Sequence, residues 1–201
     1  FFGVKCGEKN VFFTNNDSAY ESALCLYNTG IEVDAIIDIR NNSNSKIVKA
    51  VEQIGIQIYW SHTVVDTNGY RRLNNISIMK LSNDGMTVTG DRINISCDCL
   101  GVAGGWTPAV HLFTQSGGKL RFDEDNNVFL PNKYPSDQIS VGSCNGNFNL
   151  KEIINELSIK LKEFLKINQT DFDNIAIESE EETSKRNIWL LPSDKAIGKT
   201  K

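Results

Sequence analysis

The chain has 201 residues, of which 40% are hydrophobic and 23% charged, and its formal net charge is −4. This composition is typical of a soluble globular protein that is long enough to bury a core, and the negative charge argues against nucleic-acid and anionic-membrane surfaces. No apolar run approaches the roughly 20 residues that a membrane-spanning helix requires.

The first sixty residues alternate short apolar runs with amphipathic segments. Ser18, with Glu21 three residues later, predicts a helix start, and Gly30 is placed to end that helix. Strands that alternate with single helices predict a parallel sheet, as in half of a dinucleotide-binding fold. In chain order, the predicted elements are a strand at 11–15, a helix from 18, a strand at 33–39, a helix at 47–54 and a strand at 56–60.

Beyond residue 60 the pattern changes to β-like runs separated by turn signals. Asn-Gly and Asp-Gly pairs end at Gly69 and Gly85, which predicts an antiparallel meander. Residues 93–103 then predict one long strand, on which Cys97 and Cys99 would share a face. The runs of the meander lie at 63–66, 72–81 and 86–89.

The last third contains one strong amphipathic helix. Residues 107–131 are rich in turn formers, and residues 139–142 predict a short strand. Asn149, with Glu152 three residues later, predicts the capped start of the helix, which carries an apolar stripe. After Lys166 the chain becomes polar and acidic, which predicts a linker.

The cysteines and histidines indicate a protein without disulfides or metal. The five cysteines are odd in number and include no C-x-x-C pair, which argues against a disulfide framework and a zinc ribbon. We therefore predict reduced thiols in a cytoplasmic protein. Only His62 and His111 are present, so most histidine-rich metal sites are excluded, and no spacing supports a catalytic triad.

The first strand–helix junction is where a dinucleotide fold would bind a pyrophosphate. Its loop, residues 14–19, contains no glycine, although such loops need glycine for a tight turn and close backbone approach. Thr14 and Asn15 can still hydrogen-bond a polar ligand, and Asp38 stands where an acidic residue would bind an adenine ribose. Arg40 would suit a 2′-phosphate instead. Alternatively, the loop binds no nucleotide, and Asp38 and Arg40 are surface or capping residues.

Two glycine-containing segments are better candidates for cofactor contacts. Gly104-Gly105 follows an apolar strand, where a ligand can approach the backbone closely. The turn at 142–146 precedes a helix, so its backbone N–H groups suit phosphate or ribose hydroxyls. Ordinary turns have the same composition, so the pattern alone leaves both interpretations open.

Two segments resemble the alpha subunit of heterotetrameric sarcosine oxidase. The first is residues 14–20, and the second, longer and more specific, is residues 101–121, which read GVAGGWTPAVHLFTQSGGKLR. The match runs in order from about residue 3 to 166 and continues through residues 189–192. The resemblance implies an internal segment of a longer subunit, which would explain why the chain begins with Phe1 rather than Met.

The resemblance implies an α/β fold with three parts. Residues 1–86 would form a nested Rossmann-like, NAD-binding-like domain with a parallel sheet, helices and an antiparallel meander. Residues 87–166 would return to a larger dinucleotide-binding domain and complete part of it. Residues 167–201 would be a linker toward a downstream folate-binding domain.

The function implied is oxidative demethylation of sarcosine to glycine, with hydrogen peroxide and methylene-tetrahydrofolate as the other products. The alpha subunit would bind NAD, mainly through an upstream loop. FAD and FMN would be bound in the full complex, tetrahydrofolate in the downstream domain, and the partners would be the beta, gamma and delta subunits. No catalytic residue and no metal ligand is expected in this chain. The expected cofactor contacts are Ala103, Gly104, Gly105, Trp106, Gly142, Ser143 and Asn145, and more weakly Thr14, Asn15 and Asp38.

Two other functions compete with this one. The chain could belong to an amine or opine dehydrogenase, or to another pyridine-nucleotide reductase with similar domains. Ser143 stands where related reductases carry Asp, and this weakens a flavin site here. The third possibility is a non-catalytic interaction module with a degenerate nucleotide site.

Overall fold

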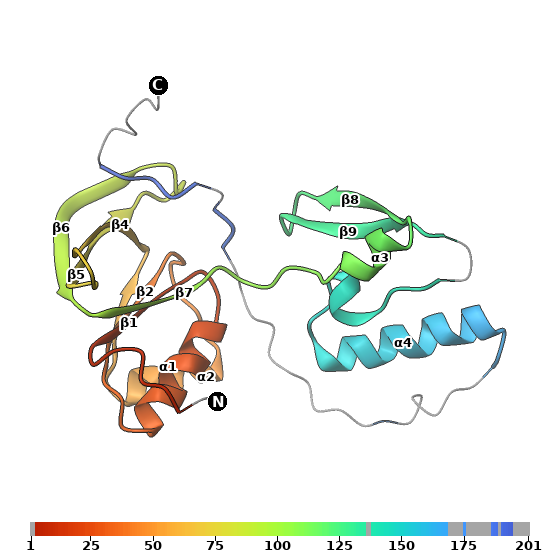
Figure 1. Cartoon of the computed structure of the whole chain (residues 1–201), viewed down its shortest axis with the longest axis horizontal. Helices are drawn as coiled ribbons and strands as arrows, with labels where there is room; N and C mark the ends of the chain where they lie inside the picture. Colours follow the sequence, from red (N-terminus) through yellow and green to blue (C-terminus); the bar gives the residue numbers. More distant parts are fainter. Residues whose placement is uncertain (1–2, 136–137, 169–174, 176–185, 189, 195–201) are drawn as a thin grey trace. The chain divides into compact units, whose positions relative to one another are not determined.

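The computed structural model of the chain describes residues 3–135, 138–168, 175, 186–188 and 190–194 (Figure 1). Contacts divide the chain into unit 1, Phe1–Gly105 with Thr183–Lys201, and unit 2, Trp106–Glu182. The predicted boundary between residues 86 and 87 concerns the domains of a longer protein and stays a prediction. Within this chain the division falls after Gly105, because strands on both sides of residue 87 pair in one sheet.

Unit 1 is built on a four-stranded parallel sheet with the strand order β3-β2-β1-β7. The chain moves outward from β1 through β2 to β3 and later returns to the other side of β1, so the order reverses between β1 and β7. This α/β architecture confirms the predicted alternation of strands and helices. The elements are β1 (Asn10–Thr14), α1 (Ser18–Asn28), β2 (Val33–Asp38), α2 (Lys46–Gln53), β3 (Gln57–Trp60) and β7 (Cys99–Ala103).

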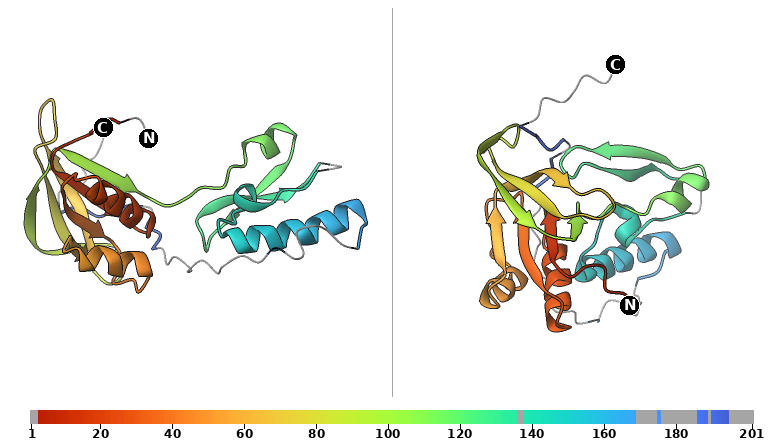
Figure 2. Two further views of the ribbon diagram at one scale, coloured as in Figure 1. Left: turned by 90° about the horizontal axis from the view of Figure 1, so that it is seen from below. Right: turned by 60° about the vertical axis from the view of Figure 1, so that its left-hand side comes forward.

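The parallel sheet is covered on both faces, and Figure 2 shows these layers from two further directions. Successive strand residues point to opposite faces, so Ile36 joins the cluster under the helices, with Tyr20, whereas Ile37 joins the opposite cluster. That opposite cluster includes Ile76 and Ile78 of the meander. Burial on both faces explains why the second strand reads as a continuous apolar run.

The meander forms a separate three-stranded antiparallel sheet in the order β4-β5-β6, which confirms the prediction. Its strands are β4 (His62–Asn68), β5 (Asn75–Leu81) and β6 (Val88–Ser96).

The single strand predicted for residues 93–103 is wrong. The chain leaves the meander after Ser96 and enters the parallel sheet at Cys99. Between them, Asp98 accepts hydrogen bonds from two backbone N–H groups that precede β1, at 2.9 and 3.0 Å, and Cys97 is buried. Because of this bend, the first part of the run 93–103 belongs to the meander and the last part to the parallel sheet. Cys97 and Cys99 therefore do not lie on one strand.

Unit 2 contains a helix, a hairpin and a second helix. The hairpin was missed because turn formers dominate its sequence, and the strand predicted for residues 139–142 does not form. Val141 has an extended backbone, but no strand among the described residues pairs with it. Asn149 caps the last helix as predicted, because its side chain accepts a hydrogen bond from the Glu152 N–H. The elements are α3 (His111–Gln115), β8 (Lys119–Asp123), β9 (Val128–Lys133), the 3₁₀ turn η1 (Gly142–Asn145) and α4 (Leu150–Leu165).

A buried arginine joins the loops that follow β1 and β2. Arg40 pairs with Asp17 and with Asp38, each at 2.7 Å, and all three side chains are at most 4% exposed. Its guanidinium also lies 5.8 Å from the ring centre of Tyr20 and 6.0 Å from that of Trp60. Burial alone would lower the pKa of Arg40, but hydrogen bonds and charge from the two carboxylates outweigh it and raise that pKa. The arginine therefore stays charged.

Replacing Arg40 with alanine should destabilise unit 1 by about 3–5 kcal/mol, because two buried carboxylates would lose their counter-ion. Denaturant unfolding followed by tryptophan fluorescence measures this loss. Arg71→Ala is the matched control, since Arg71 is exposed in the same unit, and should change the stability by no more than about 0.5 kcal/mol. Equal effects of the two substitutions would contradict a role for the buried pair.

Candidate functional site

The carboxyl ends of β1, β2 and β7 meet at one edge of the parallel sheet (Figure 1). Open α/β sheets bind ligands at the point where the strand order reverses, outside these ends. We call residues 14–17, 38–40 and 103–105 the sheet crest. The expected contacts Ala103, Gly104 and Gly105 and the weaker candidates Thr14, Asn15 and Asp38 all lie on it.

In the loop after β1, Thr14 and Asn16 bond groups of the loop itself. Thr14 Oγ1 donates to the Asn16 carbonyl at 2.8 Å and accepts from the Asn16 N–H at 3.1 Å. The Asn16 side chain accepts from the Ser18 N–H at 2.9 Å, so the predicted Ser18–Glu21 capping box is replaced by a cap from the preceding loop. These bonds occupy backbone donors that a phosphate loop would offer to its ligand.

Asn15 connects the loop after β1 with the glycine segment after β7. Its backbone N–H donates to the Ala103 carbonyl at 3.4 Å, and its side-chain amide donates to the Gly104 carbonyl at 3.1 Å. Gly105 has φ +100°, a conformation that favours glycine. Asn15 also bonds Arg186, a residue that sequence reasoning missed because it follows the acidic segment and belongs to no motif.

Asp38 lies inside the protein, so the surface placement considered for it is wrong. Its carboxylate accepts from the Arg40 N–H at 2.8 Å, from the Arg40 guanidinium and from the Tyr20 hydroxyl at 2.8 Å. Both oxygens are engaged in these bonds. It thus caps the loop after β2, and a ribose contact would require it to give up these bonds.

The turn η1 in unit 2 holds the other expected contacts around a carboxylate of α4. Glu156 accepts from the Gly142 N–H at 3.0 Å, from the Asn145 amide at 2.5 Å and from Lys160 at 2.7 Å. Burial alone would raise the pKa of Glu156, but these three hydrogen bonds lower it below the ordinary value of 4.5. The turn therefore presents an N–H group that binds an anionic oxygen, and Ser143 remains exposed beside it.

Trp106, the remaining expected contact, lies at the start of unit 2. It is 68% exposed, and its ring centre lies 6.5 Å from that of Phe148. The pair presents an exposed aromatic surface.

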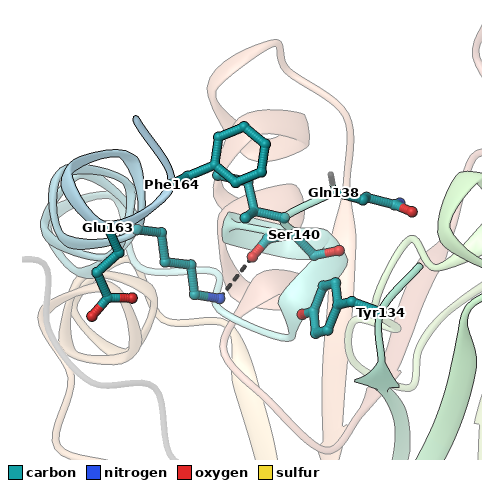
Figure 3. A pocket seen from close by; sticks show the side chains of 7 residues that line it. Tyr134, Gln138, Ser140, Glu163 and Phe164 are labelled. Atoms are coloured by element: carbon teal, nitrogen blue, oxygen red, sulfur yellow. Dashed lines mark hydrogen bonds between the residues drawn. The ribbon is translucent and has the colours of Figure 1, made fainter. Parts of the chain in front are cut away.

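An open cavity of about 340 Å³ lies between α4 and the segment before η1. Figure 3 shows Tyr134 and Phe164 around it. The Lys160 ammonium donates to the Ser140 carbonyl at 2.7 Å. Sequence reasoning missed this cavity because its lining comes from separate segments without a motif. The lining residues are Tyr134, Gln138, Ile139, Ser140, Lys160, Glu163 and Phe164.

The described part of the chain contains no candidate metal centre and no candidate membrane span. There, His, Cys, Asp and Glu side chains do not gather in groups of three or more that could hold a metal ion. The helices that the structure describes are also too short or too polar to cross a membrane.

Sequence comparison identifies relatives, although no protein-family model matches. The chain is 34% identical over 149 residues to sarcosine oxidase subunit alpha of Corynebacterium sp. (strain P-1). It is 31% identical over 130 residues to the subunit of the same name from Rhizobium meliloti (strain 1021). These matches cover 73% and 64% of this chain but only 15% and 12% of the relatives.

Comparison with solved structures supports the fold. The HOCl-induced flavoprotein disulfide reductase RclA from Escherichia coli aligns with a TM-score of 0.52 and 14% identity, over 80% of this chain and 36% of that chain. This likeness shows the fold alone. The relation to the alpha subunits of sarcosine oxidases rests on the sequence matches, in which the chain corresponds to a small part of each relative.

Proposed function

We propose that the chain works as a segment of a sarcosine oxidase alpha subunit, where it contributes to NAD binding and to subunit assembly. The complete complex would convert sarcosine to glycine, hydrogen peroxide and methylene-tetrahydrofolate, with FAD, FMN and tetrahydrofolate bound outside this chain. The similarity to two alpha subunits supports this assignment, and the chain spans about 15% of the length of the relative from strain P-1.

The observation that carries the assembly role is the incomplete burial of α4. Its sequence has the apolar stripe of a core-facing helix, yet among residues 150–165, all of which the structure describes, Ser158 alone is buried. Phe164 and Leu165, at the end of the stripe, are 44% and 54% exposed, and the other stripe residues are only partly buried. Amphipathic helices normally bury such a stripe against other protein. We infer that unit 2 forms part of a larger dinucleotide-binding domain whose remainder covers α4.

The fit of NAD differs between the two candidate places. The loop after β1 does not fit a pyrophosphate, because it has no glycine and its own side chains bond its backbone donors. The segment at 103–106 fits better, since Gly105 leaves the backbone accessible. At the turn η1, an oxygen of NAD would have to take the Gly142 N–H that now donates to Glu156. We propose that Gly104, Gly105 and Trp106, and separately the residues of η1, contact NAD in the longer subunit. When bound, NAD would supply hydride-transfer chemistry, and no catalytic residue is assigned to this chain.

The isolated chain is therefore expected to bind NAD no better than millimolar, whereas the whole alpha subunit binds it tightly. Isothermal titration of NAD into each protein measures the two affinities. Micromolar binding by the isolated chain, about −8 kcal/mol, would contradict the need for a loop elsewhere in the subunit.

Replacing Glu156 with glutamine should lower the stability of unit 2 by about 1–2 kcal/mol at pH 7, because a charged hydrogen-bond acceptor is lost. The pKa of Glu156 is depressed in the folded chain, so its contribution is present above pH 4.5 and disappears as the pH falls through the lower folded value. Thermal unfolding at pH 7 and pH 3 checks this. Glu163→Gln, at an exposed position of the same helix, is the control. A difference from wild type that does not shrink between pH 7 and pH 3 would contradict the assignment.

A non-catalytic interaction module remains a second candidate. It is favoured by the loop after β1, whose backbone donors are bonded by the loop's own side chains. In that case the whole alpha subunit should capture a beta-type flavin subunit while containing no bound nucleotide. Mass spectrometry of the purified alpha subunit distinguishes the two functions, since the first requires stoichiometric NAD. A flavin that copurifies with this chain alone would instead favour a dehydrogenase or reductase subunit.

A further inference from the structure

We propose that the sheet crest of unit 1 is a binding site for a guanidinium group, filled by Arg186 of the same chain. The site lies where this fold ordinarily takes a dinucleotide, but its chemistry selects a cation. The proposal rests on contacts of Arg186 with the loops after β1 and β2 and with the meander, and it does not involve Gly104 and Gly105. It therefore does not depend on the function proposed above.

Arg186 bonds three separate segments of unit 1. Its guanidinium donates to the Ile39 carbonyl at the end of β2, at 2.7 Å, and to the Asn83 carbonyl in the turn of the meander, at 3.0 Å. Its backbone N–H donates to the Asn15 carbonyl at 3.2 Å, and its own carbonyl accepts from the Asn15 amide at 3.2 Å. A planar guanidinium with donors in a fixed fork suits two carbonyls in different directions, which a lysine ammonium matches less well.

The charges around the crest favour a cation. The crest contains a buried cluster of two carboxylates and one guanidinium, which together carry one net negative charge. These residues are Asp17, Asp38 and Arg40. Asp17 Oδ2 is buried and has no hydrogen-bond partner among the described residues. Asp84 also interacts electrostatically with Arg186. Negative charge and free carbonyls attract a guanidinium and repel a pyrophosphate, which needs N–H donors and positive potential.

The chain that follows Arg186 makes a second contact with unit 1, through Asp194. Arg92 on β6 donates to both carboxylate oxygens of Asp194, at 2.5 and 2.6 Å, and to Asp66 on β4 at 3.3 Å. Figure 1 shows the described residues between 186 and 194, in blue, beside the meander. The pairing of Asp194 with Arg92 thus helps to hold Arg186 at the crest. A dinucleotide could reach the loops after β1 and β2 only by displacing Arg186.

Replacing Arg186 with alanine in the full chain tests the site, because it leaves the crest empty. The substitution should lower the melting temperature of unit 1 by about 4 °C or more, and millimolar methylguanidinium should restore part of this loss with saturation. Methylammonium at the same concentration should not restore the melting temperature of the variant. Methylguanidinium should not raise the melting temperature of wild type, because Arg186 already fills the site. Arg71→Ala, at an exposed position, is the control and should show no rescue.

Hydrogen exchange of the full chain gives a second readout that does not depend on melting. The Arg186 amide should be protected in wild type, and Asn15→Ala should speed its exchange about tenfold, because the side-chain bond to the Arg186 carbonyl is lost. Adding NAD to wild type should leave this protection unchanged. Stabilisation of the Arg186→Ala chain by NAD but not by methylguanidinium, or NAD-induced loss of protection in wild type, would overturn the proposal.

Discussion

The buried pairing of Arg40 with Asp17 and Asp38 is the interaction on which unit 1 depends. Charges removed from water destabilise a protein strongly unless they are paired and hydrogen-bonded. Here one guanidinium serves two carboxylates that follow neighbouring strands, and Tyr20 donates to the second of them. The loops after β1 and β2 are thereby fixed to each other, and their carbonyls are held in place at the crest.

Backbone groups that a cofactor could bind are instead bound by the chain's own side chains in both units. Carbonyls at the crest of unit 1 accept from Arg186, and the Gly142 N–H in unit 2 donates to Glu156. The backbone groups at the two places have opposite polarity. The crest offers carbonyl acceptors next to a cluster with net negative charge, whereas the turn η1 offers an N–H donor. The two places therefore differ in the ligand that they suit, a cation in the first and an anionic oxygen in the second.

The two units also differ in how well they bury apolar surface. Unit 1 has a cluster on each face of its parallel sheet, formed by the helices on one side and the meander on the other. In unit 2, α4 leaves large apolar side chains such as Ile159 and Leu165 more than half exposed. Since apolar burial is the main favourable term in folding, unit 2 depends more on additional protein than unit 1 does. This difference agrees with relatives that are several times longer than the chain.

The sequence by itself determined the elements that rest on local patterns. Alternating strands and helices, the meander and the Asn149 cap follow from hydrophobic period and turn residues a few positions apart, and the resemblance in residues 101–121 indicated the relatives. Only the tertiary structure decided where the apolar run 93–103 divides, that Asp38 is buried, and that Arg186 reaches Asn15 across 171 residues. Such contacts depend on which distant groups are brought together and desolvated, and local periodicity carries no information about that.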